Sequence, residues 1–325
     1  MAYTTIDDPS QYFQTDIHTG DGSGSTETFD GNSDLQPDFL WFKSRSVAGD
    51  HGWVDTSRSK PSSNNSFFIL RSNSTSAEIS VNSGSDFTAM NSDGYTYGSV
   101  HYLDLATNNS QNTVWGWKAN GGTTSTNTAG TNIDTTVQVN TTAGFSIMTY
   151  TGTGTDNDSI GHGLGAVPHW IIVKNRDETN GWQTYHHKNT SAPETDYLKL
   201  ESTNATADDH DRWSDQAPSS TVITLGGNDG VSKASTNYVC YAWTEIQGYS
   251  KFGGYTGNGN ADGPFIYTGF KPAWIMIKNN QTNGYNWVIQ DRERFGGINS
   301  GATDQNLAAN STSASPSSGS FAGNE

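Results

Sequence analysis

The 325-residue sequence predicts an all-β protein made of tandem antiparallel β-sandwich domains. Its hydrophobic content of 32% would suggest disorder, but its aromatic content reaches 11%, and disordered chains are poor in aromatic residues. The apolar residues stand in short runs between turns rich in Gly, Asn, Ser and Thr, which is typical of sandwiches and barrels. A tryptophan-bearing hairpin motif also occurs three times, which indicates repeated domains.

The clearest copy of the repeated hairpin spans residues 168–187. Residues 170–173 (WIIV) are apolar on both faces, rich in β-branched side chains and too few for a helix, so they predict a buried strand. Asn180-Gly181 predicts a tight or bulged turn, because both residue types tolerate positive φ. A second strand is expected to begin at Trp182.

Two further copies follow the same plan. The copy at residues 272–289 has an apolar run, then Asn283-Gly284, then a strand containing Trp287, and the looser copy at residues 37–54 ends in Trp53-Val54. A Thr-Gly-x-Gly marker precedes each hairpin, at residues 19–22, 151–154 and 256–259. The spacing between marker and hairpin is nearly the same in each copy, so we interpret the repeats as domain-sized units rather than solenoid repeats.

The repeats divide the chain into a series of predicted domains. They are an N-terminal docking arm (1–17), a first sandwich (18–120), a Thr/Gly/Asn-rich linker and strand lead-in (121–143), a second sandwich (144–246) and a third sandwich (247–325). Tyr12 and Phe13 are the expected docking side chains of the arm, and a frayed terminus is the alternative.

The third copy lacks strands that would match residues 222–225 and 238–243 of the second copy. An incomplete sandwich exposes strand edges, which promotes aggregation unless something covers them. We therefore expect either a longer natural gene or a neighbouring subunit that completes the third domain. A smaller third fold is the alternative.

The charge and the cysteine usage exclude several classes of function. The net charge of −16 opposes binding to nucleic acid and to anionic membrane surfaces. Cys240 is the single cysteine, so no intrachain disulfide can form, and its apolar neighbours predict a buried, inert thiol. The N-terminus lacks the pattern of a signal peptide, and no apolar run approaches the ~20 residues of a membrane span, so we expect synthesis in a cytoplasm and use elsewhere.

Residues that could support chemistry give weak signals. Adjacent side chains on a strand point to opposite faces, so His186 and His187 are not expected to chelate one ion together. The segments 208–211 (DDHD) and 156–158 (DND) are weak candidates for Ca²⁺, because carboxylate-rich loops are also ordinary solvated turns. No pair of carboxylates alternates beside aromatics on a strand, as a glycosidase would require. The sequence therefore predicts no enzyme, no cofactor and no metal.

Trp53, Trp182 and Trp287 stand at similar places in the three hairpins and allow two interpretations. Their rings could stack on the C–H faces of sugars at an adhesion surface. They could equally pack in the cores of the sandwiches, and their recurrence in all three copies favours this fold requirement.

The repeated pattern resembles proteins of tailed bacteriophages of marine bacteria and cyanobacteria. The resemblance lies in the Thr-Gly-x-Gly marker, in the proline before an aromatic strand that ends in Lys-Ser or Lys-Asn, and in the opening residues 1–10 (MAYTTIDDPS) followed by Tyr12-Phe13. It covers the first two copies and the front half of the third. The resemblance implies jelly-roll, concanavalin A- or laminin-G-like sandwiches and a tail-fibre or spike location. It implies no catalytic residues.

We therefore expect a virion surface protein that mediates adhesion to host-surface glycans, with symmetric copies supplying avidity. By analogy with fibres, a homotrimer attached to other virion proteins through its N-terminal arm is expected. A structural head decoration or tail connector protein is the first alternative. A polysaccharide depolymerase is the second.

Overall fold

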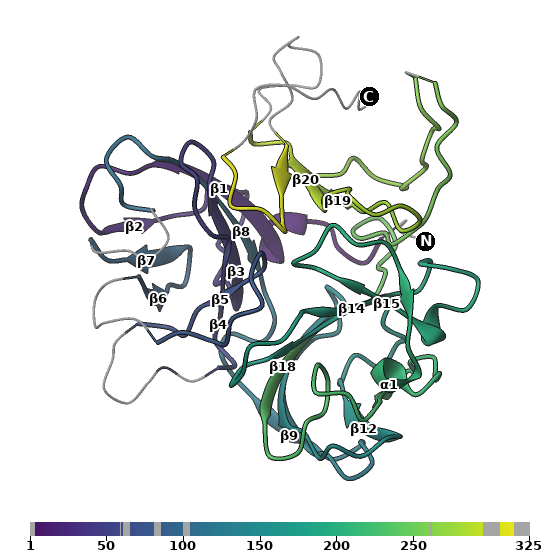
Figure 1. Cartoon of the computed structure of the whole chain (residues 1–325). Coiled ribbons are helices and arrows are strands. Elements are labelled where there is room, and N and C mark those ends of the chain that lie inside the picture. The colour runs from purple at the N-terminus through teal and green to yellow at the C-terminus, as the bar shows by residue number, and fades with distance from the viewer. Residues whose placement is uncertain are drawn as a thin grey trace.

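The computed structural model describes residues 4–58, 60, 66–80, 86–99, 105–260, 262–294 and 306–314 (Figure 1). Within these residues the chain is almost entirely β, and every strand pair is antiparallel apart from one isolated bridge. The prediction of an all-β chain of antiparallel sandwiches is confirmed. Three repeated units, defined below by their strands, supply the sheets.

The first unit is organised around a five-stranded sheet in the order β1-β8-β3-β4-β5. Its strands are β1 (Phe13–Thr19), β3 (Phe39–Ser44), β4 (Gly52–Asp55), β5 (Leu70–Arg71) and β8 (Gln111–Trp117). A smaller outer sheet, in the order β2-β7-β6, completes the sandwich. It comprises β2 (Ser25–Glu27), β6 (Phe87–Met90) and β7 (Tyr95–Tyr97).

The second unit repeats this sheet order as β11-β18-β13-β14-β15. Its strands are β11 (Phe145–Thr151), β13 (Trp170–Asn175), β14 (Gln183–His186), β15 (Asp196–Lys199) and β18 (Asn237–Trp243). Three more strands, β9 (Ser125–Asn127), β10 (Thr135–Asn140) and β16 (Ala207–Asp208), extend the sheet at its two ends. The outer layer is the pair β12 (Asp158–Gly161) and β17 (Val222–Leu225).

The third unit is smaller within the described residues. It consists of β19 (Trp274–Ile277), β20 (Val288–Asp291) and β21 (Leu307–Ala308), in that order. These strands correspond to β3-β4-β5 and β13-β14-β15, because the cross-strand pairs Phe39↔Asp55, Trp170↔His186 and Trp274↔Asp291 occupy the same place in each hairpin. The described helices are short: η1 (Pro9–Gln11), η2 (Pro193–Thr195) and α1 (His210–Trp213).

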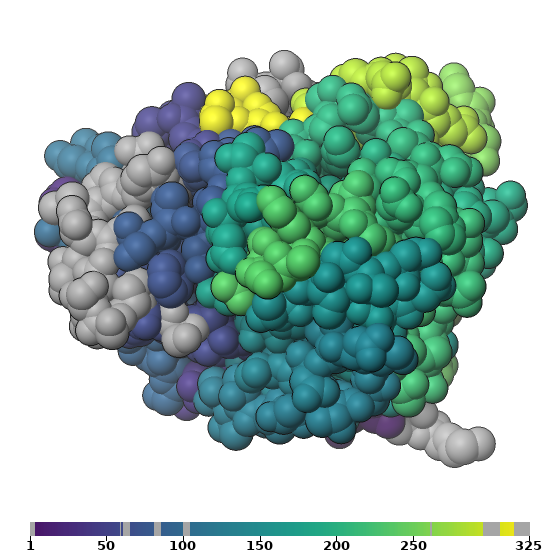
Figure 2. Space-filling view, turned by 60° about the horizontal axis from the view of Figure 1, so that its bottom comes forward, coloured from purple at the N-terminus to yellow at the C-terminus, as the bar shows by residue number. Residues whose placement is uncertain are grey.

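One hydrophobic core joins all three units. In this shared core, β3 and β8 supply Trp41 and Trp115, β13 and β18 supply Ile172 and Tyr241, and β20 supplies Ile289. The opposite faces of the two complete sheets are covered by separate outer cores, one beneath each outer sheet. Figure 2 shows residues of the second unit, in teal and green, lying directly against blue residues of the first unit.

Equivalent contacts link each unit to the preceding one. Trp182 Nε1, in the second unit, donates to the carbonyl oxygen of Arg71 in the first unit at 2.9 Å, and Trp287 Nε1, in the third unit, donates to that of Lys199 in the second at 2.9 Å. Arg71 lies on β5 and Lys199 on β15, the last strands of the matching series β3-β4-β5 and β13-β14-β15, and the two residues occupy the same place. These repeated bonds fix the order of the units around the shared core.

The first unit also contacts the third, which closes the ring of units. His51 is fully buried, and its Nδ1 accepts a hydrogen bond from Trp41 Nε1 at 2.9 Å. Ala308 of β21 is the residue that matches Arg71 and Lys199, and its carbonyl faces the His51 ring. Burial lowers the pKa of His51, and this carbonyl opposes part of that fall. Ser72 of the first unit donates to the carbonyl of Ala309 at 2.7 Å.

The sequence markers have identifiable local roles. The second glycine of each Thr-Gly-x-Gly marker adopts positive φ: 90° at Gly22, 73° at Gly154 and 69° at Gly259. In the predicted Asn-Gly turns, Gly284 has a φ of 95°, whereas Gly181 does not enter the left-handed region. That turn is instead held by Lys174, whose Nζ donates to the Asn180 carbonyl at 2.8 Å.

The predicted linker and arm contain regular structure. β9 lies within residues 121–143, and β10 pairs with both β9 and β11. β1 begins at Phe13, inside the predicted arm, and pairs with β8 along its whole length. No helix among the described residues has the length and apolar character that a bilayer span requires.

Candidate functional site

The three predicted adhesion or packing tryptophans are all buried. Trp53 and Trp182 have no exposed surface, and Trp287 is 5% exposed. All three belong to the shared core, and Trp53 and Trp182 contact each other edge to face with ring centroids 4.7 Å apart. Stacking on a glycan needs an open ring face, so this burial favours the packing interpretation.

The structural register separates Trp53 from the other two tryptophans. Asp55, His186 and Asp291 occupy the same place in the three hairpins. Trp182 and Trp287 each lie four residues before this place. In the first unit, the residue four positions before Asp55 is His51. Trp53 instead lies directly opposite Trp41. Counting along the sequence cannot detect this two-residue offset, because the first hairpin has a different turn.

Tyr12 and Phe13 both contact residues of this chain. The Phe13 ring lies 4.8 Å from the Trp117 ring, and the Tyr12 ring makes an edge contact with Tyr249 at 6.2 Å. Tyr12 thereby connects the start of the chain to the beginning of the third unit. Docking of this segment on a virion protein stays a prediction.

The single cysteine and the two acidic loops have defined surroundings in the structure. Burial raises the pKa of the Cys240 thiol and keeps the thiol protonated. Asp209 caps α1 by accepting from the Asp211 N–H at 3.1 Å. Asp156 accepts a hydrogen bond from Ser214 Oγ at 2.6 Å and forms an ion pair with His210. Asp209 and Asp156 thus both bind other groups of the chain.

An open pocket of about 500 Å³ lies where the second unit meets the third. The segment after β18 supplies one wall, and Tyr267 and Thr268 supply the other. The complete lining comprises His169, Glu245, Gln247, Gly248, Ser250, Lys251, Tyr267 and Thr268. Tyr267 is 71% exposed, so its ring stands open at the rim.

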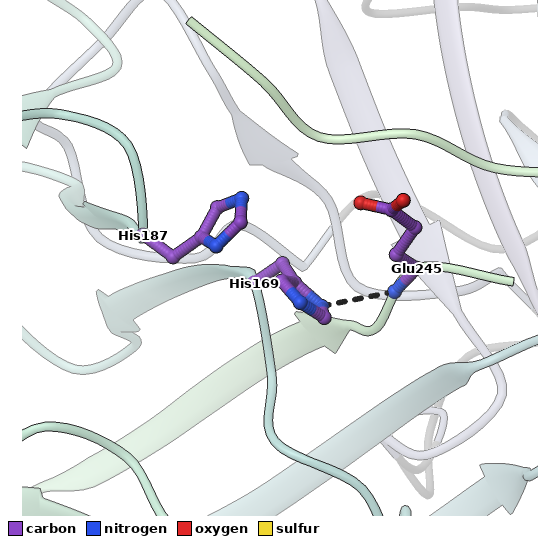
Figure 3. A group of neighbouring side chains, drawn as sticks. All are labelled: His169, His187 and Glu245. Atoms are coloured by element: carbon purple, nitrogen blue, oxygen red, sulfur yellow. Dashed lines mark hydrogen bonds between the residues drawn. The ribbon is translucent and has the colours of Figure 1, made fainter. Parts of the chain in front are cut away.

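Two lining residues, His169 and Glu245, form a cluster with His187, which does not line the pocket (Figure 3). Each offers one potential ligand atom, and these atoms lie within 4.8 Å of one another. The two imidazole rings meet edge to face with centroids 4.4 Å apart. Burial lowers the pKa of both histidines, and the neighbouring His187 ring lowers that of His169 further, so neutral imidazoles are favoured near pH 7.

The hydrogen bonds of the cluster work against coordination of a metal ion by His169. His169 Nδ1 accepts from the backbone N–H of Glu245 at 3.0 Å, which places the proton of the neutral ring on Nε2 and removes the lone pair a metal would need there. The Glu245 carboxylate forms an ion pair with Lys251. Nε2 of His187 lies 2.8 Å from the carbonyl oxygen of Phe252, an arrangement in which the ring donates.

Asp38 of the first unit reveals the structural role of His169. Both residues follow the proline that precedes a central strand, and both accept from backbone N–H groups just after β8 or β18. Asp38 accepts from Ala119 at 2.7 Å, from Gly121 at 2.9 Å and from Gly122 at 2.7 Å. His169 is therefore a capping residue of the fold, and the sequence signal for it was the position after the proline.

These features define an all-β protein of three units around one core, with an open pocket, lined mostly by polar residues, where the second unit meets the third. The chain belongs to the family described as a domain of unknown function (DUF7483), whose model matches residues 8–322. One family model thus spans all three units, in agreement with their shared core. No curated protein and no solved structure matches the chain significantly.

Proposed function

We propose that this chain is a virion surface protein, a tail-fibre or spike subunit, that binds saccharides of a host surface at the pocket beside Tyr267. The observation that carries the proposal is the exposed Tyr267 ring at the rim of an open pocket with a polar lining. Such a combination suits a saccharide, because its C–H face packs on an aromatic ring while its hydroxyls seek hydrogen bonds.

The pocket supplies both donors and acceptors for hydroxyl groups. Gln247 offers an amide, Lys251 an ammonium group and Glu245 a carboxylate. Because Lys251 and Glu245 already pair, the lining has no large net charge, which favours a neutral sugar. A shallow site of this kind would bind weakly, so several copies in one particle, for example in a trimer, would supply avidity.

The proposal is tested with a panel of soluble neutral and acidic bacterial polysaccharides, with binding measured by calorimetry and glycan-array fluorescence. Tyr267→Ala should reduce binding by about tenfold or more, because it removes the stacking surface. Tyr285→Ala is the matched control, since Tyr285 is 54% exposed and does not line the pocket. Equal losses in both variants, or no binding to any polysaccharide, would contradict the proposal.

A structural role in the virion, as a head decoration or tail connector protein, is the second candidate. The incomplete cover of the third unit favours it, because an uncovered sheet suits contact with another protein. A depolymerase would require a second carboxylate about 5–10 Å from Glu245, and the pocket lining provides one carboxylate. An adhesive role without catalysis is therefore the form of the proposal that we retain.

A further inference from the structure

We propose that the third unit accepts an extended segment of a partner protein, which adds as an antiparallel strand to the edge of β19 that no described residue pairs with. The inference goes beyond saccharide binding and does not depend on it. Four observations on described residues carry it: the edge of β19, the environment of Gly257, the conformation of residues 250–256 and the position of His186.

The first observation is the unpaired edge of β19. In the complete units, the central strands β3 and β13 each pair on both sides, with β8 and β18 as one of the neighbours. Among the described residues, β19 pairs with β20 alone. Its four residues, WIMI, are all apolar, and an apolar strand edge without charges readily pairs with another strand.

The second observation concerns the first glycine of each Thr-Gly-x-Gly marker. A Cβ atom at Gly20 would collide with the Thr107 carbonyl, and one at Gly152 would collide with the Lys233 carbonyl. Both carbonyls belong to the segments that lead into β8 and β18. Gly257, the third counterpart, has no atom within 4 Å of a Cβ built on it. The third unit thus keeps a glycine suited to a segment that the described residues do not contain.

The third observation is the missing first strand of the third unit. β1 pairs with β8 alone, and β11 depends on β18 for one of its two neighbours. Residues 250–256, which precede the third marker in the same way, contain no strand. An isolated strand cannot satisfy its backbone groups, so the absence of a closing strand accounts for the irregular conformation.

The fourth observation is a repeated contact between neighbouring units. Asp55 of β4 accepts from the hydroxyl of Tyr241 on β18 at 2.6 Å. Asp291 of β20 accepts from Nε1 of Trp115 on β8 at 2.9 Å. His186 is their counterpart on β14, and the ring order places it opposite a closing strand of the third unit. A hydrogen-bonding side chain is therefore already positioned for the incoming aromatic residue.

The two existing closing strands define the chemistry of the partner. Opposite the central strand, β8 presents Val114-Trp115-Gly116-Trp117 and β18 presents Cys240-Tyr241-Ala242-Trp243. The aromatic residues face the shared core, and the small residues face the outer side. The partner segment should read small apolar, aromatic, small, tryptophan, with its last residue opposite Trp274.

The test uses the full-length protein and a fluorescent peptide with the sequence of residues 105–118, which includes Thr107 and β8. Binding is measured by fluorescence anisotropy, and the control peptide carries Trp115→Ser and Trp117→Ser. Saturable binding of the first peptide, weakened about tenfold or more in the second, is expected. Analytical ultracentrifugation of the free protein shows whether a second copy occupies the same edge.

A pair of glycine variants separates this contact from general effects on folding. Gly257→Val should weaken peptide binding about tenfold by blocking the approach of the segment, whereas Gly253→Val should not. Both glycines have open space around them, so both variants should fold. The proposal is overturned by absence of saturable binding, by equal binding of the two peptides, by equal effects of the two glycine variants, or by a stable dimer that excludes the peptide. None of these readouts involves Tyr267, so the saccharide proposal stands or fails separately.

Discussion

The second and third hairpins have the same design and different surroundings. Ile171 on β13 and Ile275 on β19 occupy matching places, yet Ile171 has no exposed surface and Ile275 is 40% exposed. The inner faces of both hairpins enter one shared core, whereas only the outer face of β13 lies beneath an outer sheet. The comparison shows that the shared core is enough to form the hairpin, and that burial of its outer face depends on an outer layer such as β12-β17, which the described part of the third unit lacks.

The inner contacts explain why the incomplete unit still folds onto the others. The Trp274 ring lies 5.7 Å from the Trp117 ring and 6.5 Å from the Trp170 ring, so it contacts both complete units. Aromatic pairs of this kind contribute about 0.5–1.5 kcal/mol each beyond the burial of their area. We expect four measurable effects, two of which compare a complete unit with the incomplete one, and the largest effect lies in the first unit.

The largest effect is expected from the buried ion pair of the first unit. Asp55→Ala should lower the free energy of unfolding by about 3–5 kcal/mol, because it removes the buried carboxylate that pairs with Arg58 and accepts from the Tyr241 hydroxyl. The Arg58 guanidinium then keeps only Glu78 and the Trp53 carbonyl as acceptors. Denaturant unfolding measures the loss. Asp50→Ala is the control, because the Asp50–Arg71 pair is partly exposed and should cost about 1 kcal/mol or less. Similar losses in the two variants would contradict the argument that burial makes the Asp55 contacts more costly to break.

The second prediction compares the two matched isoleucines directly. Ile171→Ala should lower the free energy of unfolding by about 2–5 kcal/mol, because it leaves a cavity under the outer sheet. Ile275→Ala should cost about 1 kcal/mol or less, since much of that side chain is already in water. Equal losses in urea titrations would mean that the outer face of β19 is covered after all.

The third prediction concerns the acid sensitivity that buried histidines of the second unit contribute. Burial lowers the pKa of His162 and of His186 to about 4. The unfolded chain binds their protons first as pH falls, so the free energy of unfolding should decrease from about pH 6.5 to about 4, by up to ~1.4 kcal/mol per pH unit for each group. Above about pH 6.5 neither group contributes a slope.

His162→Asn should remove one such contribution from the pH profile measured by denaturant unfolding. His210→Asn is the control with the opposite sign, because Asp215 and Asp156 raise the pKa of His210 to about 8. Its stabilisation is present below about pH 6.5 and is lost as pH rises through about 8. A His162→Asn profile as steep as that of the parent protein would contradict the assignment.

The smallest effect is expected from the lysines at the ends of the central strands β13 and β19. Lys174 Nζ donates to the carbonyls of Thr75, Asn175 and Asn180, whereas Lys278 Nζ donates to the Tyr285 carbonyl at a more exposed turn. Lys174→Met should cost about 1–3 kcal/mol, and Lys278→Met about 0.5 kcal/mol or less. Thermal unfolding of both variants measures the difference, and a reversed order would show that the turns differ from this description.

The sequence predicted local elements better than their assembly. The hairpins at Trp170 and Trp274, together with the strands at Val114 and Tyr238, could be recognised because short apolar runs between polar turns have one simple interpretation. The shared core could not be recognised, because apolar periodicity shows that a face is buried and does not show which distant segment buries it.

The candidate site was largely beyond sequence reasoning. His169 and Glu245 are 76 residues apart and meet only because the end of β18 lies beside the start of β13. Tyr267 resembled any other aromatic residue in the sequence, since exposure depends on what covers a side chain. Trp182 and Trp287 do occupy matching places, but Trp53 does not, and its two-residue offset follows from turn geometry that composition does not reveal.

Hydrogen exchange of the free protein, followed by mass spectrometry, tests the central claim most directly. The comparison is between amides of β13, residues 170–175, and amides of β19, residues 274–277. The account predicts that β13 exchanges only through global unfolding and that β19, with one edge open, exchanges about tenfold faster or more. Equal protection of both strands in the monomer would contradict the claim that the third unit is open where the other two are closed.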